Sequence, residues 1–206
     1  MDLLASLKIF LRNQQALRSL SKDNLKIHFG SGNIKLPGWL NTDLFDRDEN
    51  LKIKPDMYLN ITQKLPFKNN VASFLYNEHL VEHIEVEKIT LFFKEAYRIL
   101  KKGGVLRLAT PDLEHLAKKY LSKSWKKQDW LSWPEYRFIK TKAEMLNIAM
   151  RWWEHKYLYD EEELKRRLRE SGFKKIKRVD WRKSQYPDLR NLETRKDSKL
   201  IMEVVK

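Results

Sequence analysis

The feature that most restricts the fold of this chain is the alternation of short apolar runs with amphipathic helical segments. Residues 25–29, 38–44, 55–61, 71–76 and 105–109 are predicted to form strands, and residues 78–100 carry apolar side chains at helical spacing. Further helices are expected over 113–121 and 161–171, followed by strands at 175–181 and 200–205. This order predicts an α/β fold with a mainly parallel sheet. The last two strands, with no helix between them, predict an antiparallel pair at its edge.

The composition fits a folded protein with a sizeable core. The chain has 206 residues, of which 42% are hydrophobic and 12% aromatic, and this excludes disorder over most of its length. It has no cysteine, so disulfide frameworks, thiolate nucleophiles and cysteine-ligated metals are excluded. No apolar stretch is long enough to span a membrane, and the N-terminus lacks the layout of a signal peptide. We therefore expect a cytoplasmic protein.

Polar features follow each of the first three predicted strands. A glycine turn, Gly30-Ser31-Gly32-Asn33, follows the first strand, Asp43 closes the second, and Asn60-Ile61 closes the third. Parallel sheets bind ligands at the carboxyl ends of their strands, and glycine lets the backbone approach a ligand closely. A carboxylate can accept hydrogen bonds from two ribose hydroxyls, and an Asn amide can pair with an adenine edge. Each feature alone also fits ordinary turn or strand-end chemistry.

A dinucleotide is a poor fit to this glycine turn. The position where a third glycine would stand in that fingerprint is Lys35, and Pro37 and Gly38 interrupt any helix beginning there. A ligand without phosphates suits the turn better.

As a set, these and further motifs resemble class I S-adenosylmethionine-dependent methyltransferases, in particular the small bacterial branch called type 11. The further motifs are Gly38–Asp43, Leu65-Pro66-Phe67, Asn77–Ile84 and Glu95–Gly104. The resemblance implies a Rossmann-like sheet of about seven strands with helices on both faces, and S-adenosylmethionine as cofactor. It implies that the glycine turn wraps the methionine part, that Asp43 binds the ribose and that Asn77 borders the methionine group. The full cofactor-binding set expected is Gly30, Ser31, Gly32, Asn33, Asp43, Leu44, Asn60, Ile61 and Asn77.

Two departures from the family pattern bear on the cofactor pocket. The family usually has an acidic residue just before the glycine turn, where this chain has Ile27-His28-Phe29. Only ten residues separate Gly32 from Asp43, so the usual first helix is expected to be shortened or missing. A methyltransferase-like binding module without cofactor is therefore an alternative to an enzyme.

One domain is expected over residues 1–206. Residues 1–22 are predicted to form an amphipathic leader helix that packs on the domain or on another copy; contact with a membrane surface is an alternative. Residues 25–112 are expected to be the cofactor-binding core, and residues 113–159 a Trp-rich insertion, called the Trp-rich segment below. Residues 160–206 would hold the last helix and the final two strands.

Candidate catalytic residues are expected near the acceptor. Methyl transfer from a sulfonium needs mainly orientation, with a base only where the acceptor loses a proton. His79, expected four residues before His83 on one helical face, is the first candidate for a base. Asp112 and His155 are further candidates, and all three could instead have structural roles. No metal site is expected, because no third ligand matches the two histidines.

The Trp-rich segment and the charge bear on the partner. Five of the seven tryptophans lie within residues 120–153, and their faces could stack on sugars or bases. This favours a lid that covers a small-molecule or glycan acceptor. An aromatic subcore or a homodimer surface is the alternative. The net charge of +14 leaves RNA as an alternative acceptor.

Overall fold

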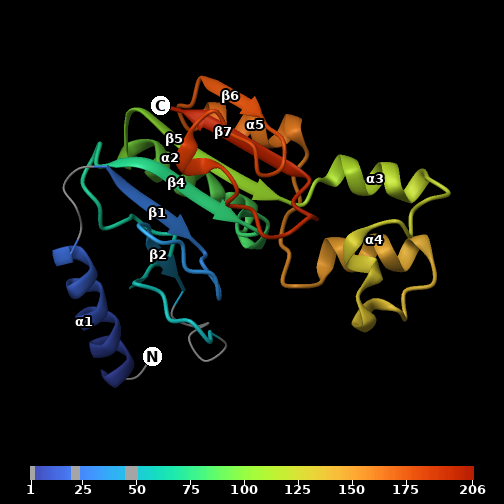
Figure 1. Ribbon diagram of the computed structural model, residues 1–206, viewed down its shortest axis with the longest axis horizontal. Helices are drawn as coiled ribbons and strands as arrows, with labels where there is room; N and C mark the ends of the chain where they lie inside the picture. The colour runs from blue at the N-terminus through green and yellow to red at the C-terminus, as the bar shows by residue number, and fades with distance from the viewer. Residues whose placement is uncertain (1–2, 20–23, 45–50) are drawn as a thin grey trace.

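A seven-stranded sheet forms the centre of the computed structural model, which describes residues 3–19, 24–44 and 51–206 (Figure 1). The strand order is β3-β2-β1-β4-β5-β7-β6. Five strands run parallel: β1 (Leu25–Phe29), β2 (Leu40–Asp43), β3 (Met57–Tyr58), β4 (Ala72–Glu78) and β5 (Leu100–Thr110). The strands β6 (Lys175–Arg178) and β7 (Leu200–Val205) pair antiparallel with each other, and β7 pairs antiparallel with β5. The predicted mainly parallel sheet with an antiparallel edge pair is confirmed.

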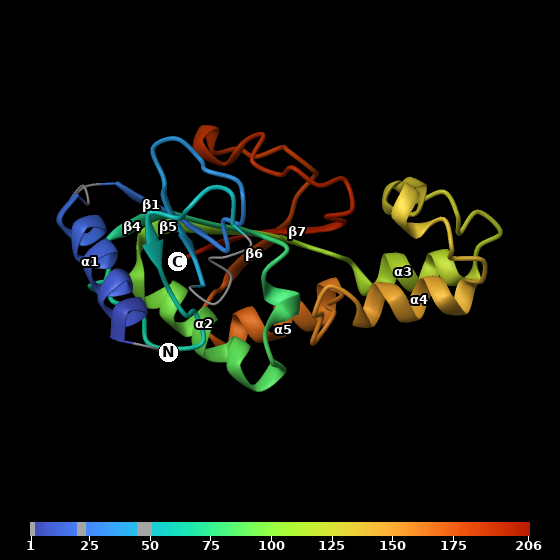
Figure 2. The same ribbon diagram turned by 90° about the horizontal axis from the view of Figure 1, so that it is seen from below.

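Helices α1 (Leu3–Ser19), α2 (Val86–Ile99) and α5 (Glu161–Glu170) contribute to one apolar cluster on one side of the sheet (Figure 2). In α2 the residues Ile89, Phe92, Phe93, Ala96 and Ile99 are buried, as expected for an amphipathic helix against a sheet. In the described ranges the other side is covered by loops, which include the 3-10 turn η5 (Pro187–Leu189). Residues 33–39, between the glycine turn and β2, form turns and loops instead of a crossover helix, so no helix from this connection covers the second face.

The helix expected over residues 78–100 is shorter at both ends. Strand β4 continues to Glu78, which pairs with Ala109 of β5, and His79 then leaves the strand with a φ of 50°. A 3-10 turn, η2 (Val81–His83), precedes α2. His79 and His83 therefore do not share a helical face. At the other end β5 begins at Leu100, five residues before the strand predicted from the sequence.

The Trp-rich segment projects from the end of the sheet as a pair of helices, α3 (Leu113–Leu121) and α4 (Lys142–Arg151) (Figures 1 and 2). Two 3-10 turns, η3 (Asp129–Ser132) and η4 (Pro134–Tyr136), connect them. Trp130 and Met145 are buried in an apolar cluster that belongs to this segment alone. The segment thus has a small core of its own beside the main one.

The leader helix packs on the domain next to β3. Asn13 donates to the carbonyl oxygen of Tyr58 at 2.9 Å and accepts from its N–H at 2.8 Å. Leu7, Phe10 and Leu11 are exposed on this helix. The expected range of 1–22 includes residues 1–2 and 20–22, which lie outside the described residues. Across the described ranges, no helix combines the length and the apolar character needed to cross a membrane.

Candidate functional site

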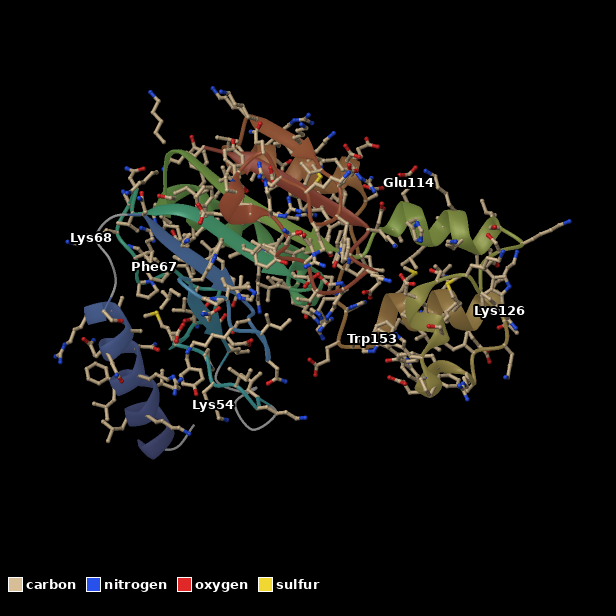
Figure 3. The ribbon with its side chains drawn as sticks, viewed as in Figure 1. Lys54, Phe67, Lys68, Glu114, Lys126 and Trp153 are labelled. Carbon is tan, nitrogen blue, oxygen red and sulfur yellow. The ribbon has the colours of Figure 1, made fainter. Side chains whose placement is uncertain are left out.

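A cavity of about 1080 Å³ lies at the carboxyl ends of the parallel strands and extends to the Trp-rich segment. This is the place where parallel α/β sheets bind ligands, and the volume is that of a site for a molecule larger than a nucleoside. In Figure 3 Trp153 lies between the sheet and α4. Of the residues expected at the site, all but Asn77 line this cavity: Gly30, Ser31, Gly32, Asn33, Asp43, Leu44, Asn60, Ile61, His79, Asp112 and His155.

The glycine turn after β1 has a backbone that few other residues adopt. Gly30 and Gly32 have φ of 64° and 54°, in the left-handed region. A Cβ on Gly30 would stand 2.8 Å from the Leu80 side chain, whereas a Cβ on Gly32 would meet no atom within 4 Å. Gly30 is thus needed for packing, and Gly32 presents bare backbone to open space.

Asp43 ends β2 and joins the glycine turn directly. Its Oδ2 accepts the N–H of Gly32 at 2.6 Å, and its Oδ1 accepts the N–H of Leu44 at 2.7 Å. The residue is 5% exposed and lines the cavity. Since each carboxylate oxygen has two lone pairs, Asp43 keeps the capacity to accept hydroxyl hydrogens. The bare backbone at Gly32 and this carboxylate therefore fit the nucleoside and amino-acid parts of S-adenosylmethionine.

Two asparagines near the cavity use their side-chain oxygens within the protein. Asn33 Oδ1 accepts the N–H of Lys52 at 2.6 Å and thereby ties the loop after residue 50 to the glycine turn. Asn60 Oδ1 accepts the N–H and the hydroxyl of Thr62, at 2.9 and 2.7 Å. Asn60 thus forms a local turn of the kind the sequence also allowed.

The expectation that Asn77 borders the cofactor is corrected by the structure. Asn77 lies within β4 between Phe29 of β1 and Leu108 of β5, is fully buried, and does not line the cavity. Its side-chain oxygen and nitrogen have no hydrogen-bond partner. The expected helix start placed Asn77 in a connecting segment, but the extra length of β4 keeps it inside the sheet.

His79 and Glu82 form a buried pair beside the cavity. His79 Nδ1 lies 3.2 Å from Glu82 Oε1, and His79 Nε2 lies 3.1 Å from the Ser198 hydroxyl. Burial disfavours protonation of His79, but the hydrogen bond and charge of Glu82 outweigh it and raise its pKa. Burial alone would raise the pKa of Glu82, yet the two histidines His79 and His83 lower it to about 2. Both ring nitrogens of His79 are therefore held by protein groups.

Asp112 has a structural position at the start of α3. Its Oδ1 accepts the N–H of Glu114 at 3.0 Å and so caps the helix, while Oδ2 accepts from Arg178 Nη2 at 2.7 Å. The residue is 3% exposed. Both oxygens of this candidate catalytic carboxylate thus have partners in the protein.

His155 lies where the Trp-rich segment returns to the sheet. Its Nδ1 is 2.8 Å from the Ala149 carbonyl oxygen, and its ring centroid is 5.0 Å from that of His83. Burial lowers the pKa of His155 and favours the neutral ring. All five histidines of the chain line this one cavity: His28, His79, His83, His115 and His155.

Comparison with known proteins bears on the family. The family model described as "Methyltransferase domain" matches residues 44–108, whereas no curated protein matches the sequence. A SAM-dependent methyltransferase from Thermotoga maritima is 19% identical, with 98% of this chain and 92% of that chain covered and a TM-score of 0.51. One from Archaeoglobus fulgidus is 13% identical, with 98% and 94% covered and a TM-score of 0.52. PigF with SAH is 13% identical, with a TM-score of 0.52; the match covers 92% of this chain and 53% of that one.

The chain has the class I S-adenosylmethionine-dependent methyltransferase fold. At these identities the solved structures show the fold alone, and the family model described as a methyltransferase domain matches less than half of the chain. The acceptor is not identified by either comparison.

Part of the cavity comes from residues that the sequence did not indicate. Arg195, Asp197 and Lys199 line it from the connection between β6 and β7. Glu78 holds this connection by accepting the N–H of Thr194 at 2.9 Å. Because these contacts join residues more than a hundred positions apart, no local pattern could have revealed them.

Proposed function

We propose that this methyltransferase transfers a methyl group from S-adenosylmethionine to an uncharged small-molecule or glycan acceptor bound in the same cavity. The observation that carries the proposal is the continuity of the cavity, which is lined by Gly32 and Asp43 at one end and by Trp130, Trp133 and Trp153 at the other. Cofactor and acceptor can then meet in one continuous space.

The cofactor end of the cavity binds and orients. Asp43 accepts the ribose hydroxyls, the backbone at Gly32 contacts the amino-acid tail, and Ile61 packs against the adenine ring. The cofactor supplies an already activated methyl group, so the rate depends chiefly on the alignment of the two reactants. In this proposal His79 and Asp112 are positioning residues, because protein partners already occupy their polar atoms.

The charge of the cavity lining as a whole favours a neutral acceptor over RNA. Acidic residues outnumber basic ones in the lining, although the whole chain carries a net charge of +14. The acidic residues are Asp43, Glu78, Asp112, Asp129, Glu154 and Asp197, and the basic residues are Lys119, Lys127, Arg195 and Lys199. Such a lining offers no excess of cations to a polyphosphate backbone, and nucleic-acid binding depends on such an excess. Tryptophan faces, by contrast, suit an uncharged sugar or ring.

Calorimetry with S-adenosylmethionine and with its demethylated product S-adenosylhomocysteine tests the cofactor part. We expect the wild-type protein to bind both, and Asp43→Ala to bind at least about 10-fold more weakly, since hydrogen bonds to a charged group contribute about 1.5–3 kcal/mol. The matched control is Asp188→Ala, because Asp188 pairs with Lys26 and does not line the cavity. Folded wild-type protein that gives no heat would favour the cofactor-less binding module, and equal affinities of the two variants would overturn the role of Asp43.

A further inference from the structure

Three side chains gather where the Trp-rich segment meets the sheet, away from the proposed cofactor contacts. Glu82, His83 and His155 each offer one ligand atom, and these atoms lie within 4.8 Å of one another. We propose that this cluster binds one divalent first-row transition cation of the zinc or cobalt type. Two imidazoles and one carboxylate are a donor set that such cations take, with further positions left open.

The backbone holds this cluster together across a long stretch of sequence. The N–H groups of Lys156 and Tyr157 both donate to the carbonyl oxygen of Glu82, at 2.7 and 3.1 Å. His155 is therefore fixed beside Glu82 and His83 by main-chain bonds, and its approach does not depend on mobile side chains. A metal site needs this kind of prior placement, because a ligand held loosely has to be ordered when the ion binds.

The surroundings orient two of the three ligands as metal-binding residues are usually oriented. A carbonyl oxygen only accepts, so the bond between His155 Nδ1 and Ala149 places the hydrogen on Nδ1 and the lone pair on Nε2. Glu82 Oε2 accepts the Thr110 hydroxyl at 2.9 Å. Outer partners of this type fix the tautomer of a ligating histidine and the angle of a ligating carboxylate.

Neighbouring groups hold the carboxylate of the cluster in place, and its two histidines reach the cavity. Glu82 is fully buried, and its Oε1 lies 3.2 Å from His79 Nδ1. His83 and His155 line the cavity, so a cation held by them would be accessible from its interior. An oxygen atom of the acceptor would complete the coordination there; this last step rests on the proposed function, whereas cation binding does not.

Cobalt(II) titration of the full chain, after treatment with a chelator and without cofactor or acceptor, tests the site directly. We expect one cobalt ion per chain with visible d–d absorption, and loss of this absorption when zinc is added. His155→Asn keeps a nitrogen near the Nδ1 position for the bond to Ala149 but removes the Nε2 ligand. It should lower the cobalt affinity by more than about 100-fold, and Thr110→Val, which removes only the outer bond to Glu82, by about 10- to 100-fold.

The control is His115→Asn, because His115 lines the same cavity but lies outside the cluster. We expect it to bind cobalt as the wild type does, and thermal unfolding of each variant without metal verifies that it is folded. No cobalt binding by the wild-type protein would overturn the proposal, as would equal loss in His115→Asn and His155→Asn. Since the titration contains no S-adenosylmethionine, its failure and a failure of the cofactor calorimetry are separate results.

Discussion

Gly30 and Gly32 share a left-handed backbone but differ in their surroundings, and this difference gives a matched pair of substitutions. An alanine at either position meets the backbone strain, which costs about 1–2 kcal/mol. At position 30 the new Cβ would also stand 2.8 Å from Leu80, whereas at position 32 it faces open space. We expect Gly30→Ala to lower the free energy of unfolding by about 1–3 kcal/mol more than Gly32→Ala, because overpacking adds to strain. Urea unfolding of both variants measures this, and equal losses would contradict the packing role of Gly30.

His28, in the run Ile27-His28-Phe29 before the glycine turn, predicts a dependence of stability on pH. Burial, opposed in part by the Asn41 hydrogen bond, lowers the pKa of His28 from 6.5 to about 4. The unfolded chain therefore takes up this proton first as the pH falls. The contribution to stability is complete above pH 6.5 and is lost between pH 6.5 and about 4.

The variant His28→Asn isolates this effect, because Asn keeps a donor near Nδ1 for Asn41 but does not titrate. Between pH 7 and 4.5 we expect the wild type to lose about 2–3 kcal/mol more unfolding free energy than the variant, by the usual 1.36 kcal/mol per pKa unit. Urea denaturation at the two pH values gives the comparison. Parallel losses would mean that His28 is not held neutral in the folded protein.

Residues of the site could be predicted from the sequence only where the signal is local. Gly30, Gly32 and Asp43 follow strand ends, and the structure brings them together through the bond from Gly32 N–H to Asp43. The approach of His155 to Glu82 depends on main-chain bonds across 74 and 75 positions, which no spacing pattern records. The spacing of His79 and His83 therefore offered no third ligand, and the sequence did not predict the grouping of Glu82, His83 and His155.

The boundaries of helices and strands could likewise be predicted only where the signal is local. Strands β1 and β7 and helix α3 have the predicted bounds, because each has a clear period and a clear end such as the Asp112 cap. The start of α2 was wrong by eight residues. Leu80 and Ile84 continue the apolar spacing of the helix, but the pairing of Glu78 with Ala109 in β5 extends the strand instead. Pairing between strands distant in sequence overrode the local pattern.

The Trp-rich segment offers two tryptophans of similar exposure that differ in position. Trp133 is 44% exposed and lines the cavity; Trp152 is 45% exposed, packs against Phe138 and does not line it. If the segment covers the acceptor, Trp133→Ala should weaken acceptor binding by about 5- to 100-fold, the range for loss of one aromatic stacking partner. Trp152→Ala should leave it unchanged.

Ligand-observed NMR with a panel of methyl hexosides, in the presence of S-adenosylhomocysteine, measures this difference. An equal effect of the two substitutions would contradict a specific role of Trp133. Binding of none of the sugars by the wild-type protein would contradict a neutral glycan as acceptor, and a small uncharged aromatic or hydroxylated ring would be the class left to test.

In the molecule as a whole, the excess of positive charge and the cavity lie in different places. The net charge of +14 resides outside a cavity whose lining is richer in acidic than in basic groups. We expect any affinity for bulk RNA to fall steeply with salt and to be unaffected by S-adenosylhomocysteine, because surface cations bind phosphates and the cavity does not. Competition between the two ligands in a filter-binding assay would contradict this separation.

At the scale of the whole fold, we propose that loops at the ends of parallel strands build a nucleoside site although no crossover helix lies between β1 and β2. A crystal structure of the chain with S-adenosylhomocysteine tests it most directly. We expect density for the ribose within hydrogen-bonding distance of Asp43, with the amino-acid tail along Gly30–Gly32. Density at another place on the molecule, or a cavity that stays without ligand at saturating concentration, would contradict it.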